Sequence, residues 1–105
     1  MIKLNKWGIP YSIEEKVKKR DKFCVYCHIK LKEYSRTKGT PGDKATWEHI
    51  KNDGPNSESN VVRCCCSCNA SKGTKKLSDW LESSYCKKKN ISKKTIANVV
   101  QKSYS

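Results

Sequence analysis

The fold is decided by one short stretch of the chain, Asn60–Gly73, which reads NVVRCCCSCNASKG. Within it, Cys65 and Cys68 stand with two residues between them, and Cys24 and Cys27 show the same spacing earlier in the chain. A two-residue gap lets both thiolates of a pair turn toward one ion, and two such pairs complete a tetrahedral zinc site. We therefore predict that these four cysteines bind a structural Zn²⁺ ion.

Length and composition explain why such a chain would need a metal. It has 105 residues, of which 35% are hydrophobic, and a domain of this size buries too little surface for a large margin of stability. A structural zinc site contributes on the order of 10 kcal/mol to folding. The count of seven cysteines is odd, which disfavours a domain held by disulfides alone. Cys64, Cys66 and Cys86 are left over, and as small buried hydrophobic residues they have no role assigned from the sequence.

Strand and helix signals lie on both sides of the second cysteine pair. Residues 45–50 are predicted to form a strand, and residues 52–55 follow it with the strong turn sequence Asn-Asp-Gly-Pro. A second strand is predicted to begin at Val61 and to run into the cysteines. A helix is predicted to begin near residues 66–69. The centre of the chain therefore has the order strand, loop, strand, helix.

Helices are also predicted outside this centre. Ser12 is followed three residues later by a glutamate, which is typical of a capping box before a helix at about residues 13–21. Apolar residues at helical spacing predict two further helices, one capped by Ser78 and one capped by Ser92. Residues 34–44 are rich in Ser, Thr, Gly, Pro and Lys, and they are predicted to form a loop.

A second group of residues has the chemistry of a hydrolytic site. It consists of the adjacent pair Glu48 and His49 on the first predicted strand, and of Asn60 and Asn69 further along. A neutral imidazole is suited to taking a proton from water near neutral pH. Hydrolysis of a phosphodiester also needs a cation to offset charge on the phosphate, and carboxylate and amide oxygens are ligands that suit Mg²⁺.

In order and spacing, the Glu48-His49 pair, Asn60 and the tract through Gly73 resemble the HNH nuclease family. Specifically, they look like the small bacterial and phage HNH proteins that carry a zinc knuckle. The resemblance implies an α+β fold, with a small zinc-stapled ββα-metal (His-Me finger) core and flanking helices. It also implies one HNH endonuclease domain over residues 1–105, with the motif core at about 19–73 and a helical extension at about 77–104.

The same resemblance implies a role for each residue. His49 would be the general base that activates water, and Glu48 and Asn69 would hold a catalytic Mg²⁺ or Mn²⁺ ion. Asn60 would fix the loop between the strands and so orient His49. The function implied is that of a metal-dependent DNA endonuclease that hydrolyses phosphodiester bonds.

The charge of the chain is consistent with a nucleic-acid partner. Lys and Arg number 23 against 10 Asp and Glu, which gives a net charge of +13 and favours binding to a polyanion. The candidate phosphate contacts are Lys51, Arg63, Lys72 and Lys75. We expect DNA as the partner, with RNA left open, and a monomer or a transient dimer on DNA. A zinc-dependent nucleic-acid-binding module without catalysis is the alternative, because it would have the same charge and the same cysteine pairs.

Two other classes of protein are disfavoured. Residues 24–28 match the attachment motif of c-type haem, but the only methionine is Met1, so the usual distal thioether is missing. No apolar run approaches the roughly 20 residues that a transmembrane helix needs. Residues 1–10 also lack the apolar segment of a secretory signal, so we expect a cytoplasmic protein of a bacterium or of a phage-infected cell.

Overall fold

Two short antiparallel strands form the sheet around which the helices are arranged. They are β1 (Ala45–His49) and β2 (Val61–Cys65), and the computed structural model describes residues 8–33 and 41–104 of the chain. Both strands lie where the sequence predicts them, so this prediction is confirmed. Together with the helices they make an α+β domain.

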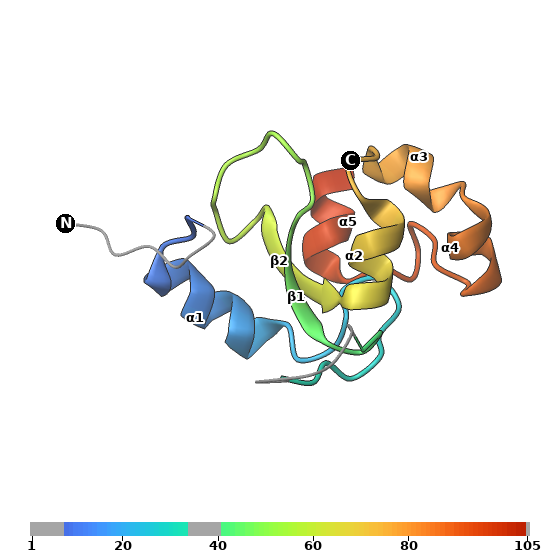
Figure 1. Cartoon of the computed structure of the whole chain (residues 1–105). Helices are drawn as coiled ribbons and strands as arrows, with labels where there is room; N and C mark the ends of the chain where they lie inside the picture. Colours follow the sequence, from blue (N-terminus) through green and yellow to red (C-terminus); the bar gives the residue numbers. More distant parts are fainter. Residues whose placement is uncertain (1–7, 34–40, 105) are drawn as a thin grey trace.

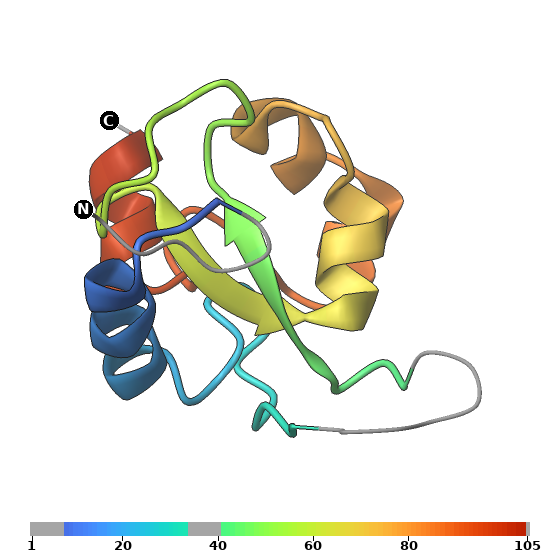
Figure 2. The same cartoon turned by 60° about the vertical axis from the view of Figure 1, so that its left-hand side comes forward.

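Alternation along β1 sends neighbouring side chains to opposite faces of the sheet. Thr46 and Glu48 contact α2 (Cys66–Lys72), whereas Trp47 packs into the small apolar cluster beneath α1 (Tyr11–Arg20). Figure 1 shows the sheet between these two helices, and Figure 2 shows the same arrangement from another side. The two faces of β1 therefore serve different purposes, one for packing and one for polar contacts.

The amino-terminal helix α1 begins earlier than the sequence predicts. Its cap residue is Pro10, whose carbonyl accepts a hydrogen bond from the Glu14 N–H at 3.0 Å. Proline suits a helix start because its ring holds φ near the helical value. Ser12 consequently lies inside the helix, which has no side-chain cap, and the predicted capping box at Ser12 is wrong.

The strand β2 passes into α2 without a loop. Cys65 is the last residue of the strand and also the cap of the helix, where its sulfur accepts a hydrogen bond from the Cys68 N–H at 3.4 Å. The helix ends at Gly73, whose φ of +53° is unfavourable for other residues. The predicted helix start near residues 66–69 is confirmed.

The chain after α2 forms shorter helices than the sequence predicts. The segment expected to follow Ser78 is divided into α3 (Leu77–Leu81) and α4 (Ser84–Lys88). The division occurs because the Ser83 side chain accepts a hydrogen bond from the Cys86 N–H and starts a new helix. Ser83, and not Ser78, is thus the serine that caps a helix in this segment.

Ser92 does not cap the last helix directly. Its carbonyl accepts hydrogen bonds from the N–H groups of Thr95 and Ile96 in a separate turn, and α5 (Asn98–Tyr104) begins only after it. Ile96 and Val100 are buried in the same apolar core as the cysteine pairs. The carboxyl-terminal helices therefore pack against the central motif.

The predicted loop at residues 34–44 is described only in part. Residues 41–44 form a turn in which the Lys44 N–H donates to the Pro41 carbonyl at 3.1 Å, while residues 34–40 lie outside the described residues. In the described ranges 8–33 and 41–104, no helix has the length and apolar character needed to cross a lipid bilayer.

Candidate metal centre and catalytic site

Four cysteines come together at the junction of β2 and α2. The Sγ atoms of Cys24, Cys27, Cys65 and Cys68 all lie within 4.8 Å of one another, and those of Cys27 and Cys65 are 3.6 Å apart. Four thiolates at about 2.3 Å from one zinc ion would be separated by about 3.8 Å, so the cluster has the dimensions of a tetrahedral site. The four residues can therefore hold a metal ion such as zinc.

Local structure turns both cysteine pairs toward this centre. In the first pair the Cys24 sulfur accepts hydrogen bonds from the N–H groups of Tyr26 and Cys27, at 3.4 and 3.5 Å. The turn closes at His28, which has a positive φ of 67°. Hydrogen bonds from the surrounding thiols, that of Cys24 first, lower the pKa of Cys27 well below its usual value. Hydrogen bonds within the same group raise the pKa of Cys24 and of Cys68, and a metal ion would bind the deprotonated form of all four thiols.

The three remaining cysteines lie outside the cluster. Cys64 and Cys86 are buried and Cys66 is half-buried, and each is a free thiol. Burial is the largest cause that raises the pKa of Cys64, so this thiol stays protonated at neutral pH. These positions behave as the small buried residues that the sequence analysis expects.

Tyr85 provides a polar contact to one of the four cluster sulfurs. Its hydroxyl lies 3.3 Å from Cys68 Sγ and 3.0 Å from Ser67 Oγ, and its ring stacks on Trp80 with a centroid distance of 6.0 Å. The stack holds the hydroxyl in place, so its proton can be donated to the sulfur. Hydrogen bonds to metal ligands orient them and tune their affinity for the ion.

We expect Tyr85→Phe to weaken zinc binding by about tenfold while the fold is retained, because the ring stays in place and the hydroxyl loses only its contacts with Cys68 and Ser67. Competition with a chromogenic zinc chelator measures the affinity. Tyr11→Phe is the matched control, since Tyr11 is exposed on α1. Equal zinc affinities for the two variants would contradict a role of the Tyr85 hydroxyl at the cluster.

A buried pair of opposite charges also joins β1 to α2. Glu48 Oε1 lies 3.9 Å from Lys72 Nζ, and the two side chains are 6% and 0% exposed. Among the described residues, neither Glu48 Oε2 nor Lys72 Nζ has a hydrogen-bond partner. Burial raises the pKa of Glu48, and the Lys72 charge opposes this shift. The pair is thus an incompletely satisfied polar group inside the domain.

A buried pair of this kind predicts an asymmetric response to substitution. Lys72→Met alone should lower the free energy of unfolding by about 3–5 kcal/mol, because it leaves Glu48 buried and unpaired. The double variant Glu48→Met/Lys72→Met, which replaces the pair with apolar side chains, should instead match or exceed the wild type, by up to about 4 kcal/mol. Denaturation of the zinc-loaded proteins in urea measures both changes.

The exposed pair of Lys16 and Glu58, separated by 4.0 Å, provides a control for these variants. Lys16→Met/Glu58→Gln should change the stability by less than about 1 kcal/mol, since exposed pairs contribute little. A double variant of Glu48 and Lys72 that is less stable than Lys72→Met would contradict the prediction.

Asn69 lies on the same side of the sheet as Glu48. Its amide nitrogen donates to Thr46 Oγ1 at 2.9 Å and to the Trp47 carbonyl at 3.2 Å. These bonds tie the middle of α2 to β1 one residue before Glu48. They also leave the amide oxygen of Asn69 as the group that can accept a ligand.

His49 turns away from this group. Its Nε2 contacts Oδ1 of Asn56, a residue of the loop between the strands, and the Asn56 amide nitrogen donates to the Gly8 carbonyl at 2.9 Å. Because Asn56 Oδ1 can only accept, Nε2 of His49 is the donor in this contact, and in the neutral ring the lone pair is then on Nδ1. Asn56 could not be predicted from the sequence, since an asparagine in a turn-rich loop has no feature that marks such a contact.

Asn60 holds the loop between the strands from inside. Its Oδ1 accepts from the Lys51 N–H at 2.9 Å, and its amide nitrogen donates to the carbonyls of Lys51 and Pro55, at 3.2 and 3.1 Å. Asn60 is 5% exposed, so these bonds satisfy a buried amide. It contacts the loop, while the side-chain contact to His49 comes from Asn56.

The four candidate phosphate contacts differ in their exposure. Lys51 and Lys75 are exposed, so a phosphate could reach them and their role stays a prediction. Lys72 is fully buried beside Glu48, and Arg63 is buried in an ion pair with Glu33 and a contact with the Trp47 ring, 5.0 Å from its centroid. Neither of these two can meet a phosphate at the surface in this structure, because their charges are already engaged inside the domain.

Comparison of the chain with models of protein families, with curated proteins and with solved structures found no match. Any function assigned to this protein must therefore be supported by the geometry and chemistry of its own residues.

Proposed function

We propose that this protein is a metal-dependent DNA endonuclease that hydrolyses phosphodiester bonds, with a ββα-metal core held by a structural Zn²⁺ ion. One observation carries the proposal: β1 ends in a buried carboxylate with an unsatisfied oxygen, followed directly by an imidazole whose Nε2 is held by an amide. A carboxylate that can take a cation beside a base that can take a proton is what phosphodiester hydrolysis requires.

His49 is the proposed general base. The contact between Asn56 and Nε2 keeps the ring in one tautomer and one orientation. Nδ1 then takes the proton of a water molecule as the water oxygen bonds to phosphorus, while the bond from phosphorus to the leaving oxygen breaks and that oxygen takes a proton from solvent. The imidazolium that forms stays hydrogen-bonded to Asn56 Oδ1, so its positive charge is stabilised on the side away from the reaction.

Glu48 and Asn69 are the residues that would hold Mg²⁺ or Mn²⁺. A bound divalent cation supplies the charge that offsets the phosphate and the leaving oxygen. The donor set fits, because Glu48 Oε2 is a buried oxygen without a partner among the described residues and Asn69 adds a second hard oxygen. Lys72 lies 3.9 Å from Glu48 Oε1 and already offsets part of the carboxylate charge, so we expect weak binding of the cation.

The test is incubation of zinc-loaded protein with supercoiled plasmid DNA, with and without Mg²⁺ or Mn²⁺. We expect cleavage only with the added ion, and the products distinguish a nickase (open circles), a site-specific enzyme (defined linear bands) and a non-specific one (a smear). Protein that binds the plasmid but gives no product with either ion would contradict the proposal.

A second candidate is a nucleic-acid-binding module without catalysis. It is favoured because Glu48 and His49 contact different partners on opposite sides of β1: Glu48 contacts Lys72, and His49 contacts Asn56. In such a module, Lys72 would be the lasting counter-ion of Glu48 in place of a metal ion. The plasmid experiment separates the two candidates, because the module would retard DNA in a gel without cutting it.

A further inference from the structure

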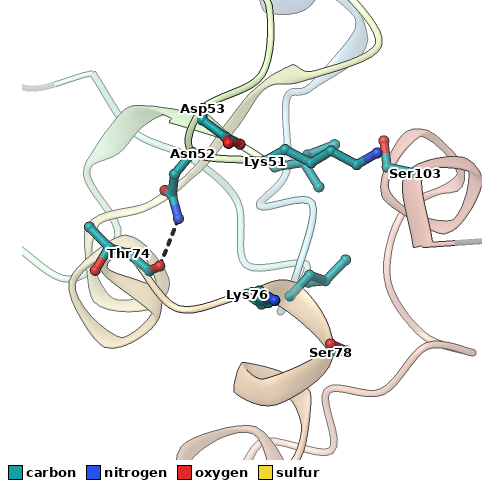
Figure 3. A pocket seen from close by; sticks show the side chains of 9 residues that line it. Lys51, Asn52, Asp53, Thr74, Lys76, Ser78 and Ser103 are labelled. Carbon is teal, nitrogen blue, oxygen red and sulfur yellow. Dashed lines mark hydrogen bonds between the residues drawn. The ribbon is translucent and has the colours of Figure 1, made fainter.

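A pocket of about 490 Å³ is lined in part by the loop that follows β1 and has no role in the chemistry above. Its walls come from residues 50–53 after β1, from Thr74 and residues 76–78, and from Ser103 on α5. The Asn52 amide donates to the Thr74 carbonyl at 2.8 Å and closes one side (Figure 3). The volume lies within the range of about 300–1,000 Å³ that is typical of small-molecule pockets.

The lining combines an apolar floor with a cationic rim. Ile50 and Leu77 are 3% and 8% exposed and contribute the apolar surface. Lys51 and Lys76 reach the pocket from opposite sides, as Figure 3 shows, and neither forms an ion pair with another described residue. Asp53 adds one acceptor, so the side chains around the opening have a net charge of about +1.

These features describe a particular kind of ligand. A flat apolar body can lie on Ile50 and Leu77, and an anionic group can meet Lys51 and Lys76. The Asp53 carboxylate can accept a hydrogen bond from an exocyclic amino group of a base. A nucleotide has all three of these parts in one unit.

We propose that the pocket binds one unpaired nucleotide of a nucleic-acid strand, with the base on the apolar floor and the phosphate between the two lysines. A base inside a duplex is stacked and cannot enter a concave pocket, so the nucleotide must be single-stranded or turned out of the helix. The pocket begins at Ile50, the residue after His49, and one wall is formed by the loop that follows β1. The inference rests on the proposed function in that the substrate is a nucleic acid.

The test compares Ser78→Glu with Ser84→Glu. Both serines are exposed near the start of a short helix, but only Ser78 lines the pocket. Zinc-loaded proteins are titrated, without Mg²⁺ or Mn²⁺, into fluorescein-labelled DNA and the anisotropy is recorded. The probes are a single strand of mixed sequence, its duplex, and a strand of equal length made of abasic nucleotides.

We expect Ser78→Glu to weaken binding of the mixed single strand by about tenfold, and Ser84→Glu by less than about twofold. On the duplex and the abasic strand the two variants should have equal, small effects. The inference would be overturned if the two variants had equal effects on all three probes. It would also be overturned if the wild type bound the abasic strand as tightly as the mixed strand, or did not bind the single strand.

This experiment is independent of cleavage, since no divalent ion is added. If the wild type never cuts plasmid but the difference between the variants is found, the pocket is retained and the endonuclease proposal fails. If plasmid is cut but the variants behave alike, the endonuclease proposal is retained and the pocket assignment fails.

Discussion

Exchange of Cys68 for serine is expected to unfold the protein at room temperature. Cys68 is fully buried and shares its cluster with three other thiols, so its loss leaves an incomplete set of ligands. A structural zinc site contributes on the order of 10 kcal/mol to folding. This is comparable with the whole stability of a small domain, about 5–15 kcal/mol. Circular dichroism and zinc content measured on the same sample report the effect.

Cys66→Ser is the matched control for this variant. Cys66 is two residues away on the same helix and lies outside the cluster, so its exchange should leave both zinc content and melting temperature close to those of the wild type. Removal of zinc from the wild type with a chelator should reproduce the spectrum of Cys68→Ser, and added zinc should restore the fold. A Cys68→Ser protein that stays folded without metal would contradict a structural role for the ion.

His49→Ala is expected to lower the rate of plasmid cleavage by about 10²–10⁴-fold, which is the usual contribution of a general base. DNA binding should change little, because a general base acts on the attacking water and not on the contacts that hold the strand. The side chain lies at the end of β1 and is half-buried, so the fold should survive its removal. Single-turnover cleavage and gel retardation, measured on the same preparation, separate the two effects.

His28→Ala controls for the loss of an imidazole, since the chain has only two histidines and His28 contacts the Thr95 carbonyl instead. It should cleave at the wild-type rate. Asn56→Ala should give a smaller loss than His49→Ala, because it removes the contact that orients the ring and leaves the ring itself. Cleavage by His49→Ala at the wild-type rate would assign the proton transfer to another group.

The elements near the cysteines could be predicted because spacing and residue type act together there. Two valines before the cysteines favour a strand, and the turn residues at 52–55 mark where β1 must have ended. The clustering of the four cysteines follows from the two pairs, each spaced so that both sulfurs can reach one centre.

The errors arose where several local signals compete or where contacts are distant in sequence. The sequence predicts a start of α1 at Ser12, but the helix begins after Pro10, whose ring holds φ near the helical value. The burial of Lys72 could not be predicted, because an isolated lysine in a basic chain normally lies at the surface. The contact of His49 with Asn56 depends on the folding of a loop, which residue spacing does not specify.

The direct passage from β2 into α2 at Cys65 restricts how this protein can vary in length. A helix turns by about 100° per residue, so one residue inserted between Cys65 and Cys66 would rotate Asn69 and Lys72 away from β1. An insertion in the loop between the strands would leave this junction intact, although it would have to spare the contacts of Asn56 and Asn60. Relatives of this chain should therefore share an uninterrupted junction, where evolution is confined to substitution.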